Sequence, residues 1–263
     1  MNEVAVGEPR KISVVVIAFN ESRHIGDCLE SVKWADDIVV LDSGSTDDTA
    51  AIARSKHARV FDIPWKGFGP QKQAAVDLAL HDLVLNIDCD ERVTPELAAE
   101  IKLILSGNNL RTAYSIPRRT FLGTSEIRHC GWYPDRTVRL FDRRKARFSS
   151  EMVHEQVVVS GETGQCKGEL LHYSFDGFTD LIAKMNRYTD IGATQLLDRG
   201  RRSRLSQVVF RPFYAFIKTF FLQKGFMDGF AGFAISVSNA VSVFYKYAKL
   251  RELAAAQDTG KKP

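Results

Sequence analysis

Short runs of apolar, β-branched residues alternate with amphipathic segments over residues 12–106. The runs occupy residues 12–19, 38–42, 59–63 and 83–87. Runs of this kind are typical of strands buried on both faces of a parallel sheet. The segments between them space apolar residues by three and four, as in Ile25, Cys28, Leu29 and Val32, which predicts helices. The alternation predicts an α/β fold with a mostly parallel sheet and right-handed crossovers.

The pattern changes after residue 106. Shorter alternating segments at 113–116, 137–141, 153–159 and 168–172 predict mixed strands. From Asp176 onward apolar residues recur at helical spacing, and residues 208–250 are dense in phenylalanine. We therefore expect three regions: a strand-and-helix domain over 1–175, a helical appendage over 176–253 and a polar tail over 254–263.

The appendage has the composition of a membrane-surface element. Its longest stretch without a charge, residues 229–245, is short for a spanning helix. Aromatic residues flanked by Lys and Arg are typical of helices that lie on a membrane. Basic residues concentrate after Lys184, which favours an anionic surface as partner. The same rings are also typical of the core of a helical hairpin or of a dimer interface.

Composition argues against several classes of ligand and partner. The formal net charge of +4 is too small to indicate nucleic acid binding. The four cysteines are scattered without a C-x-x-C pair, which argues against a zinc site and a disulfide framework. Residues 1–10 carry acids and no apolar core of signal-peptide length, so we expect a cytoplasmic protein.

Polar side chains follow three of the predicted strands. Asn20 and Glu21 follow the first, Asp42 ends the second, and Asp88 and Asp90 follow the fourth. The carboxyl ends of parallel strands share one edge of a sheet, so these groups should surround a single crevice. In an extended backbone the two aspartates would point the same way and repel each other unless a cation lay between them.

Hard oxygen ligands of this kind select Mg²⁺ or Mn²⁺, and such an ion at this edge would hold phosphates. An isolated D-x-D is also typical of a turn that caps the next helix, and Asn20 and Asp42 each fit a helix cap. No G-x-G-x-x-G follows any of the strands, which argues against a dinucleotide-dependent dehydrogenase.

Three motifs resemble, in order and spacing, the GT-A fold glycosyltransferases of family 2, which transfer a sugar from a nucleotide diphosphate with inversion. They are VVIAFNE at 15–21, VLDSGSTD at 40–47 and DCDE at 88–91. Within this family the chain resembles the small bacterial enzymes that add glucose to the inner core of lipopolysaccharide. The resemblance implies that Asp90, supported by Asp88, holds Mg²⁺ or Mn²⁺. Cys89 departs from the pattern, because many relatives have a carboxylate or a small residue there.

The resemblance also implies a nucleotide-sugar site. The residues that would surround a UDP-sugar are Ala18, Asn20, Glu21, Asp42, Lys72 and Asp88.

The family mechanism requires a carboxylate base on the acceptor side. The candidates are Glu155, in a segment that resembles the family's acceptor-side strand, and Asp135, which follows Pro134 as in a turn. We favour Glu155, and His154 beside it is a candidate donor that orients it. Four arginines crowd the same region and suit phosphates of donor or acceptor. These are Arg136, Arg139, Arg143 and Arg144.

The sequence thus predicts an inverting, metal-dependent glycosyltransferase that moves a hexose, expected to be glucose, from a UDP-sugar to a lipid-linked saccharide. The expected acceptor is the lipopolysaccharide core, and the expected place is the inner face of the cytoplasmic membrane. A polyprenyl-phosphate, capsule or exopolysaccharide glycosyltransferase is the alternative within the same class. A non-catalytic nucleotide-sugar binding module is the alternative from another class.

Overall fold

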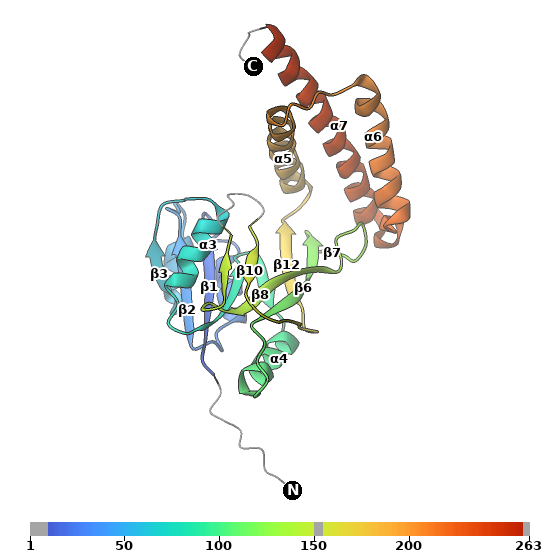
Figure 1. Ribbon diagram of the computed structural model, residues 1–263. Coiled ribbons are helices and arrows are strands. Elements are labelled where there is room, and N and C mark those ends of the chain that lie inside the picture. Colours follow the sequence, from blue (N-terminus) through green and yellow to red (C-terminus); the bar gives the residue numbers. More distant parts are fainter. Residues whose placement is uncertain (1–9, 150–154, 260–263) are drawn as a thin grey trace. The chain divides into compact units, whose positions relative to one another are not determined.

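The computed structural model describes residues 10–149 and 155–259, which form two compact units (Figure 1). The first contains residues up to Arg118 together with Asp135–His172, and the second contains Arg119–Pro134 and the chain from Tyr173 onward. The second unit thus takes up the segment 119–134 in addition to the chain that follows residue 172.

Four parallel strands form the centre of the first unit. β1 (Ile12–Ala18) pairs with β2 (Asp37–Asp42) on one side and with β4 (Leu83–Asp88) on the other, and β3 (Arg59–Asp62) pairs with β2. Ala18 lies opposite Asp42, and Ile17 lies opposite Asp88. The strands therefore end along one edge, as the polar residues at their ends predicted.

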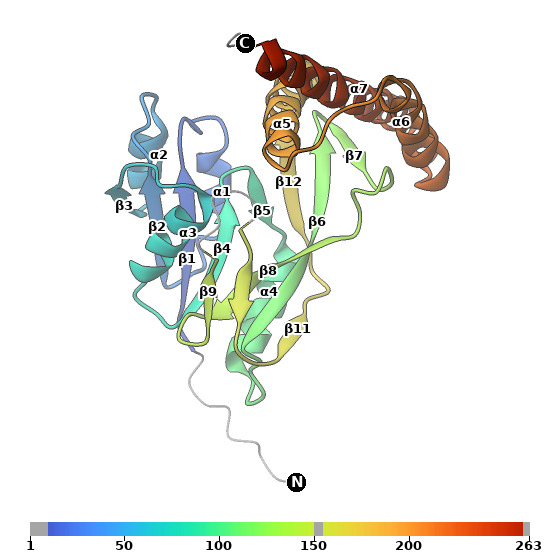
Figure 2. The ribbon, with the colours of Figure 1, turned by 45° about the horizontal axis from the view of Figure 1, so that its top comes forward.

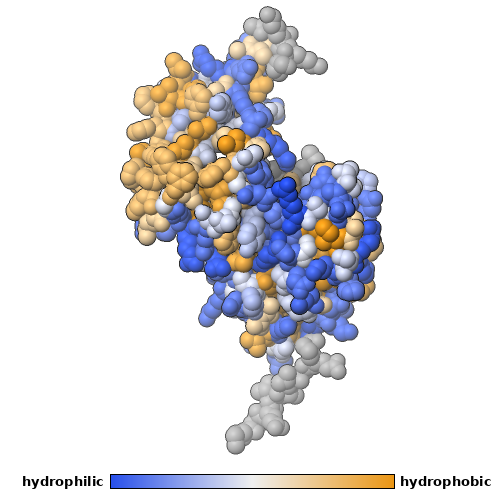
Figure 3. All heavy atoms as spheres, turned by 180° about the vertical axis from the view of Figure 1, so that it is seen from behind, coloured by the Kyte–Doolittle hydropathy of each residue, from blue (hydrophilic) through white to orange (hydrophobic). Residues whose placement is uncertain are grey.

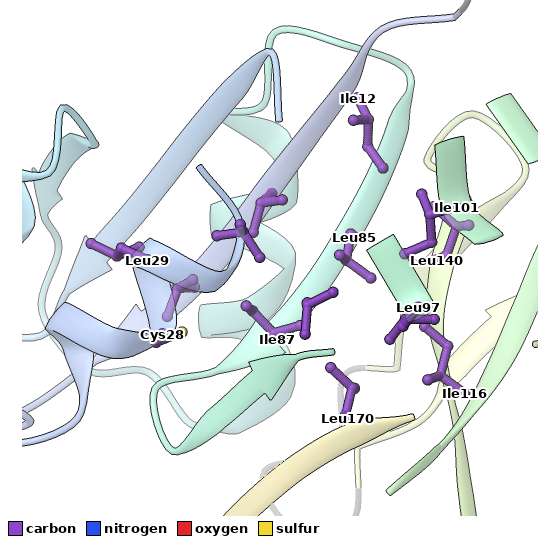
Figure 4. Close-up of a cluster of buried hydrophobic side chains, with 14 of the residues drawn as sticks. Ile12, Cys28, Leu29, Leu85, Ile87, Leu97, Ile101, Ile116, Leu140 and Leu170 are labelled. Carbon is purple, nitrogen blue, oxygen red and sulfur yellow. The ribbon is translucent and has the colours of Figure 1, made fainter. Parts of the chain in front are cut away.

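Helices cover both faces of these strands. The even-numbered Val14 and Val16 of β1 face one core and Val15 faces the other, because strand side chains alternate. The first core is closed by α1, α2 and α4 and includes Ile87 and Leu97 (Figure 4). The second core is closed by α3 (Figure 2). The bounds are α1 Ile25–Ser31, α2 Thr49–Ser55, α3 Phe68–Asp77 and α4 Pro95–Ser106.

The mixed strands continue the sheet beyond β4. β8 runs antiparallel to β4, with Leu85 opposite Leu140, and β6 runs antiparallel to β8, with Arg118 opposite Asp135. The first residues of β12 pair with β5, which places His172 opposite Glu91. β9 and β10 form a separate two-stranded sheet. The bounds are β5 Glu91–Val93, β6 Ala113–Leu122, β8 Asp135–Asp142, β9 Ala146–Phe148, β10 Val157–Val159, β11 Thr163–Gln165 and β12 Leu170–Phe175.

The second unit is mainly helical. Buried Ala193, Val208, Tyr247 and Leu250 join its three long helices in one core. The loop before β8 is tied to the helical turn, because the amides of Arg128 and His129 donate to Asp228 at 3.3 and 2.8 Å. The bounds are β7 Ser125–Ile127, α5 Phe178–Asp198, α6 Leu205–Ile217, the π-helical η1 Lys218–Leu222, the 3₁₀ turn η2 Gly225–Asp228 and α7 Gly229–Thr259.

The structure confirms the predicted fold class: a mostly parallel α/β sheet of the GT-A kind, mixed strands after it and helices at the C-terminal end. It differs at the polar tail, because α7 continues to Thr259 and residues 254–259 are helical. Within the described residues, one helical stretch, Gly225–Asp258, is long and apolar enough to cross a membrane by length and composition alone.

Candidate active site

Hydrogen bonds join the loops after β1 and β2 at the edge of the sheet. The Asn20 side chain accepts a hydrogen bond from the Thr46 amide at 2.8 Å, and the Asn20 amide donates to the Ser45 hydroxyl at 2.8 Å. Asn20 adopts a left-handed conformation with φ of 55°, which asparagine tolerates better than most residues. Asp42 is buried and accepts from the Ser45 amide at 2.9 Å. The predicted nucleotide residues Ala18, Asn20, Glu21 and Asp42 therefore lie on two adjoining strand ends.

Lys72 lies on α3 and contacts two of the other candidates. It reaches from α3 to Asp88 Oδ1 and to Glu155 Oε1, each at 2.9 Å. Its side chain is 6% exposed, so an ammonium group is held almost out of water between two carboxylates. This placement balances the desolvation of the three charges, because a buried charge is tolerated only when it is paired.

Asp88 is held between two cations that the protein itself supplies. Lys72 contacts one of its oxygens, and the Arg139 guanidinium contacts the other at 2.5 Å. Burial alone would raise the pKa of Asp88, but the attraction of Arg139 and Lys72 outweighs it and holds that pKa well below its ordinary value. Asp88 is therefore an anion in the resting protein, and both its oxygens are engaged.

Behind Asp88 lies a buried acid to which the sequence assigned no role. Glu91 is fully buried and accepts from Arg139 at 2.5 Å, from Arg118 at 3.4 Å and from the Asp88 amide at 3.0 Å. Arg118 also pairs with Asp135 through its Nε at 3.1 Å. Asp135 is thus the first residue of β8 and an ion-pair partner of Arg118, whereas the expectation of a turn at this position was wrong.

Asp90 has different neighbours from Asp88. β4 ends at Asp88 and the chain turns before β5, so the backbone is not extended through Asp90 and the alternation argument does not apply. Asp90 Oδ2 lies 3.4 Å from Nε2 of His172 on β12. Cys89 points inward to the Ile17 carbonyl at 3.2 Å, and burial raises the pKa of its thiol.

The Asp90 and His172 pair suits a divalent ion by its donor chemistry. Mn²⁺ accepts a carboxylate oxygen together with an imidazole nitrogen, and Mg²⁺ takes one or two carboxylates while keeping waters and substrate phosphates. Among the described residues, no cluster of three or more His, Cys, Asp and Glu side chains forms a complete metal cage. Waters or substrate oxygens would therefore have to complete the shell of an ion held here.

Glu155 opens onto a cavity of about 390 Å³ in the first unit. The cavity is also lined by Lys72, Asp88 and Arg139, so the charged network described above forms its wall. Phe148 and Val157 contribute apolar surface. Glu155 is thus the base candidate that faces a space large enough for part of a saccharide. The proposed orienting residue His154 lies outside the described residues.

Two of the four arginines near the bases lie elsewhere than expected. Arg143 donates to the Ala79 carbonyl at 2.8 Å, and Arg144 pairs with Asp82 at 3.0 Å, both at the opposite end of β8 from the cavity. Three residues of the site were not predicted to have a role: Glu91, Arg118 and His172. Glu91 adjoins the D-x-D motif, which is a signal for it, but Arg118 and His172 are distant in sequence and carry none.

Comparisons with known proteins agree with the geometry. The model of the family "Glycosyl transferase family 2" matches residues 13–167. The lipopolysaccharide core biosynthesis glycosyltransferase LpsC of Rhizobium meliloti is 32% identical over 251 residues, covering 91% of each chain. An uncharacterized glycosyltransferase of Rickettsia typhi is 32% identical over 256 residues, covering 93% of this chain and 88% of that protein.

Among solved structures, glucosyl-3-phosphoglycerate synthase from Mycobacterium tuberculosis, in complex with Mn²⁺, UDP and glucosyl-3-phosphoglycerate, is 29% identical over 44% of this chain and 45% of that one, with a TM-score of 0.34. That overall likeness is too low to support a functional comparison. The family model matches more than half of the chain, and the relatives match it over most of their length. They establish that the chain belongs to glycosyltransferase family 2.

Proposed function

We propose that this glycosyltransferase moves a hexose, with glucose as the expected sugar, from a UDP-sugar to a saccharide of the lipopolysaccharide core, inverting the anomeric carbon. One observation carries the proposal: the Asp90 and His172 pair and the Glu155 carboxylate both belong to the first unit, near the carboxyl end of β4. The similarity to LpsC, named for lipopolysaccharide core biosynthesis, supports the acceptor class.

The chain's own residues would divide the work by position. The loops with Asn20 and Asp42 would hold the base and ribose of the nucleotide, and Asp90 with His172 would hold Mg²⁺ or Mn²⁺. The ion supplies charge that stabilises the departing UDP. Glu155 takes the proton from the acceptor hydroxyl as that hydroxyl attacks the anomeric carbon from the face opposite UDP. One displacement of this kind inverts the configuration.

Lys72 and Asp88 position the base rather than touch the sugar in this scheme. The Lys72 ammonium lies 2.9 Å from Glu155, and this contact orients the carboxylate, which lines the cavity. Asp88 fixes Lys72 from the other side at 2.9 Å. Each candidate base pairs with a cation, but Glu155 lines the cavity whereas Asp135 is not among the lining residues, which favours Glu155.

We also propose that α6 docks on the anionic inner face of the cytoplasmic membrane. Its buried residues Val208 and Ala215 lie seven apart on one side, while large apolar side chains on the other sides face solvent. Phe210 and Phe213 are 69% and 68% exposed, and Figure 3 shows apolar surface gathered over the helical unit. Exposed cations accompany this face and suit anionic headgroups. They include Arg201, Arg204, Lys218 and Lys224.

The hairpin-core interpretation of the rings also has support, for a different subset. Phe216 and Phe220 stack at 5.4 Å, and both lie edge-on to Phe233 of α7 at 6.2 and 5.9 Å. These rings hold α6, η1 and α7 together. The outward rings of α6 are not part of that cluster, so they remain available for a membrane.

The test of the proposed reaction is Asp90→Asn, with Asp77→Asn as the matched control on the exposed end of α3. Calorimetry should show UDP binding that depends on Mn²⁺ in the parent and in Asp77→Asn. Asp90→Asn should lose that dependence, and its turnover should fall about a hundredfold, as when one preorganised electrostatic group is removed. Undiminished Mn²⁺-dependent UDP binding in Asp90→Asn would contradict the metal assignment.

A further inference from the structure

We propose that the cavity beside Glu155 binds an anionic group of the acceptor saccharide, a phosphate or a carboxylate, and that Arg136 is its main contact. The proposal rests on the proposed function, because it names the chemical class of the acceptor at that site. It adds a specificity element: the enzyme would select charged acceptors over neutral sugars of similar shape.

Cations outnumber acids on the cavity wall. Lys72, Arg118, Arg136 and Arg139 line it, against Asp88 and Glu155. All these residues belong to the first unit, so the cavity is formed by one compact body. Four cations around about 390 Å³ would repel one another unless acids or a ligand balanced them.

Three of the four cations already have carboxylate partners. Lys72 contacts Asp88 and Glu155, Arg139 contacts Asp88 and Glu91, and Arg118 contacts Glu91 and Asp135. These three cations are matched by four carboxylates, and Arg136 is the lining cation that lies outside this network.

Arg136 lies at the exposed rim and has no carboxylate within ion-pair distance among the residues that the structure describes. Its only recorded acceptor there is the Cys166 carbonyl, to which Nη1 donates at 3.0 Å. A guanidinium has five N–H donors in a planar fork, so most of its donors remain for a ligand. Such a fork matches the two oxygens of a carboxylate or a phosphate.

A second donor in the cavity wall, Nε of Arg139, lacks a hydrogen-bond acceptor among the described residues. Arg139 is 4% exposed, and this Nε is buried. A buried unpaired donor is costly, and an anion held nearby lowers that cost through its field. Two independent observations, one at the rim and one in the wall, thus favour a negative ligand.

The position of the cavity favours the acceptor over the nucleotide. Arg136, Thr137 and Val138 come from β8, on the side of β4 away from β1 and β2. The candidate nucleotide loops end β1 and β2 on the other side. An anion at Arg136 is therefore separated from the ribose site by a strand, while it shares the cavity with the base that must reach the acceptor hydroxyl.

The experiment compares Arg136→Gln with Arg136→Lys and with the control Arg147→Gln on the exposed face of β9. Ligand-observed NMR would measure the affinity of glucose 6-phosphate, glucuronate and glucose for each protein. We expect the two anions to bind and glucose not to bind. Arg136→Gln should weaken both anions roughly tenfold, the loss of one charge-assisted hydrogen bond, with partial rescue in Arg136→Lys and no change in Arg147→Gln. The anion that binds more tightly identifies the acceptor group.

UDP binding in the presence of Mn²⁺, measured on the same variants, separates this proposal from the proposed function. Unchanged UDP affinity in Arg136→Gln together with weakened anions supports an acceptor subsite. Weakened UDP with unaffected anions would assign Arg136 to the donor diphosphate and overturn the proposal. Equal binding of glucose and the anions, or no binding of either anion, would also overturn it. None of these outcomes depends on how Asp90→Asn binds UDP. The proposed reaction and the proposed acceptor subsite can therefore fail separately.

Discussion

Replacement of Arg139 by methionine tests whether the buried charge network holds the first unit together. The Arg139 guanidinium contacts Asp88 and Glu91 at 2.5 Å each and the Asn86 side chain at 3.0 Å, and it is 4% exposed. Methionine fills similar volume without charge. The change leaves Glu91 fully buried, and Arg118 at 3.4 Å is then its one cationic partner among the residues that the structure describes.

The expected loss is large for a single substitution. Removing one partner of a buried ion pair costs about 3–5 kcal/mol, because the other charge stays buried without compensation. For a chain of this size, that corresponds to a fall in Tm of roughly 6–20 °C. Adding Glu91→Gln should recover part of the loss, since the uncompensated charge is then removed as well. Arg144→Met is the matched control: the Arg144 side chain is 64% exposed, so water screens its pairs with Asp82 and Asp142 and its loss should cost about 1 kcal/mol or less.

The network also has a pH signature. Because the folded pKa of Asp88 lies well below its ordinary value, its contribution to stability is fully present above the unfolded pKa. That contribution is lost as the pH falls through the lowered folded value. Without Arg139 the folded pKa of Asp88 rises toward its ordinary value, so less stability depends on this group and the stability of Arg139→Met should fall less steeply on acidification below the unfolded pKa.

Urea unfolding followed by tryptophan fluorescence is the assay. In a Trp132→Phe background the remaining tryptophans, Trp34 and Trp65, both belong to the first unit, so the signal reports that unit. The reasoning is refuted if Arg139→Met unfolds at the same urea concentration as Arg144→Met, or if adding Glu91→Gln increases the loss.

Three further predictions concern the base, the membrane face and the packing of the first unit. Glu155→Gln should lower kcat while leaving UDP-sugar affinity nearly intact, since the base acts only in the transition state; if Asp135→Asn behaves so instead, the two roles are exchanged. The protein should float with anionic but not with neutral liposomes, because each cation near the surface contributes about 1 kcal/mol and salt screens this attraction. High salt and Phe213→Glu should each reduce flotation, and failure to float with any lipid would rule out docking. Gly168→Ala should lower stability by about 1–3 kcal/mol in urea, because its Cβ would lie 2.5 Å from Leu97 Cα, and an unchanged midpoint would show that the backbone yields freely.

The sequence by itself determined the parallel half of the sheet and the location of its acids. Runs such as 12–19 and 83–87 are too apolar for a surface and too short for a long helix, so local composition is enough to predict strands. Asn20, Asp42 and Asp88 follow such runs directly. Their convergence on one edge then follows from the geometry of parallel strands alone.

Only the tertiary structure decided which groups meet. Lys72 and Glu155 are 83 residues apart, and Asp88 and Arg139 are 51 apart, so no local spacing signals either pair. Repulsion between Asp88 and Asp90 predicted a cation between them. At Asp88 the protein itself supplies two cations, the Lys72 ammonium and the Arg139 guanidinium. A short turn sends Asp90 to His172 instead, because extended geometry ends where β4 ends.

The same distinction holds for the helices. The sequence shows that residues 208–250 are rich in aromatic rings, but periodicity cannot say which side of a helix is covered. Packing decided that Val208 and Ala215 face inward while Phe210 and Phe213 face outward, and that Phe216 and Phe220 join the hairpin. Composition is a property of the chain, whereas exposure depends on which neighbours the fold brings to each face.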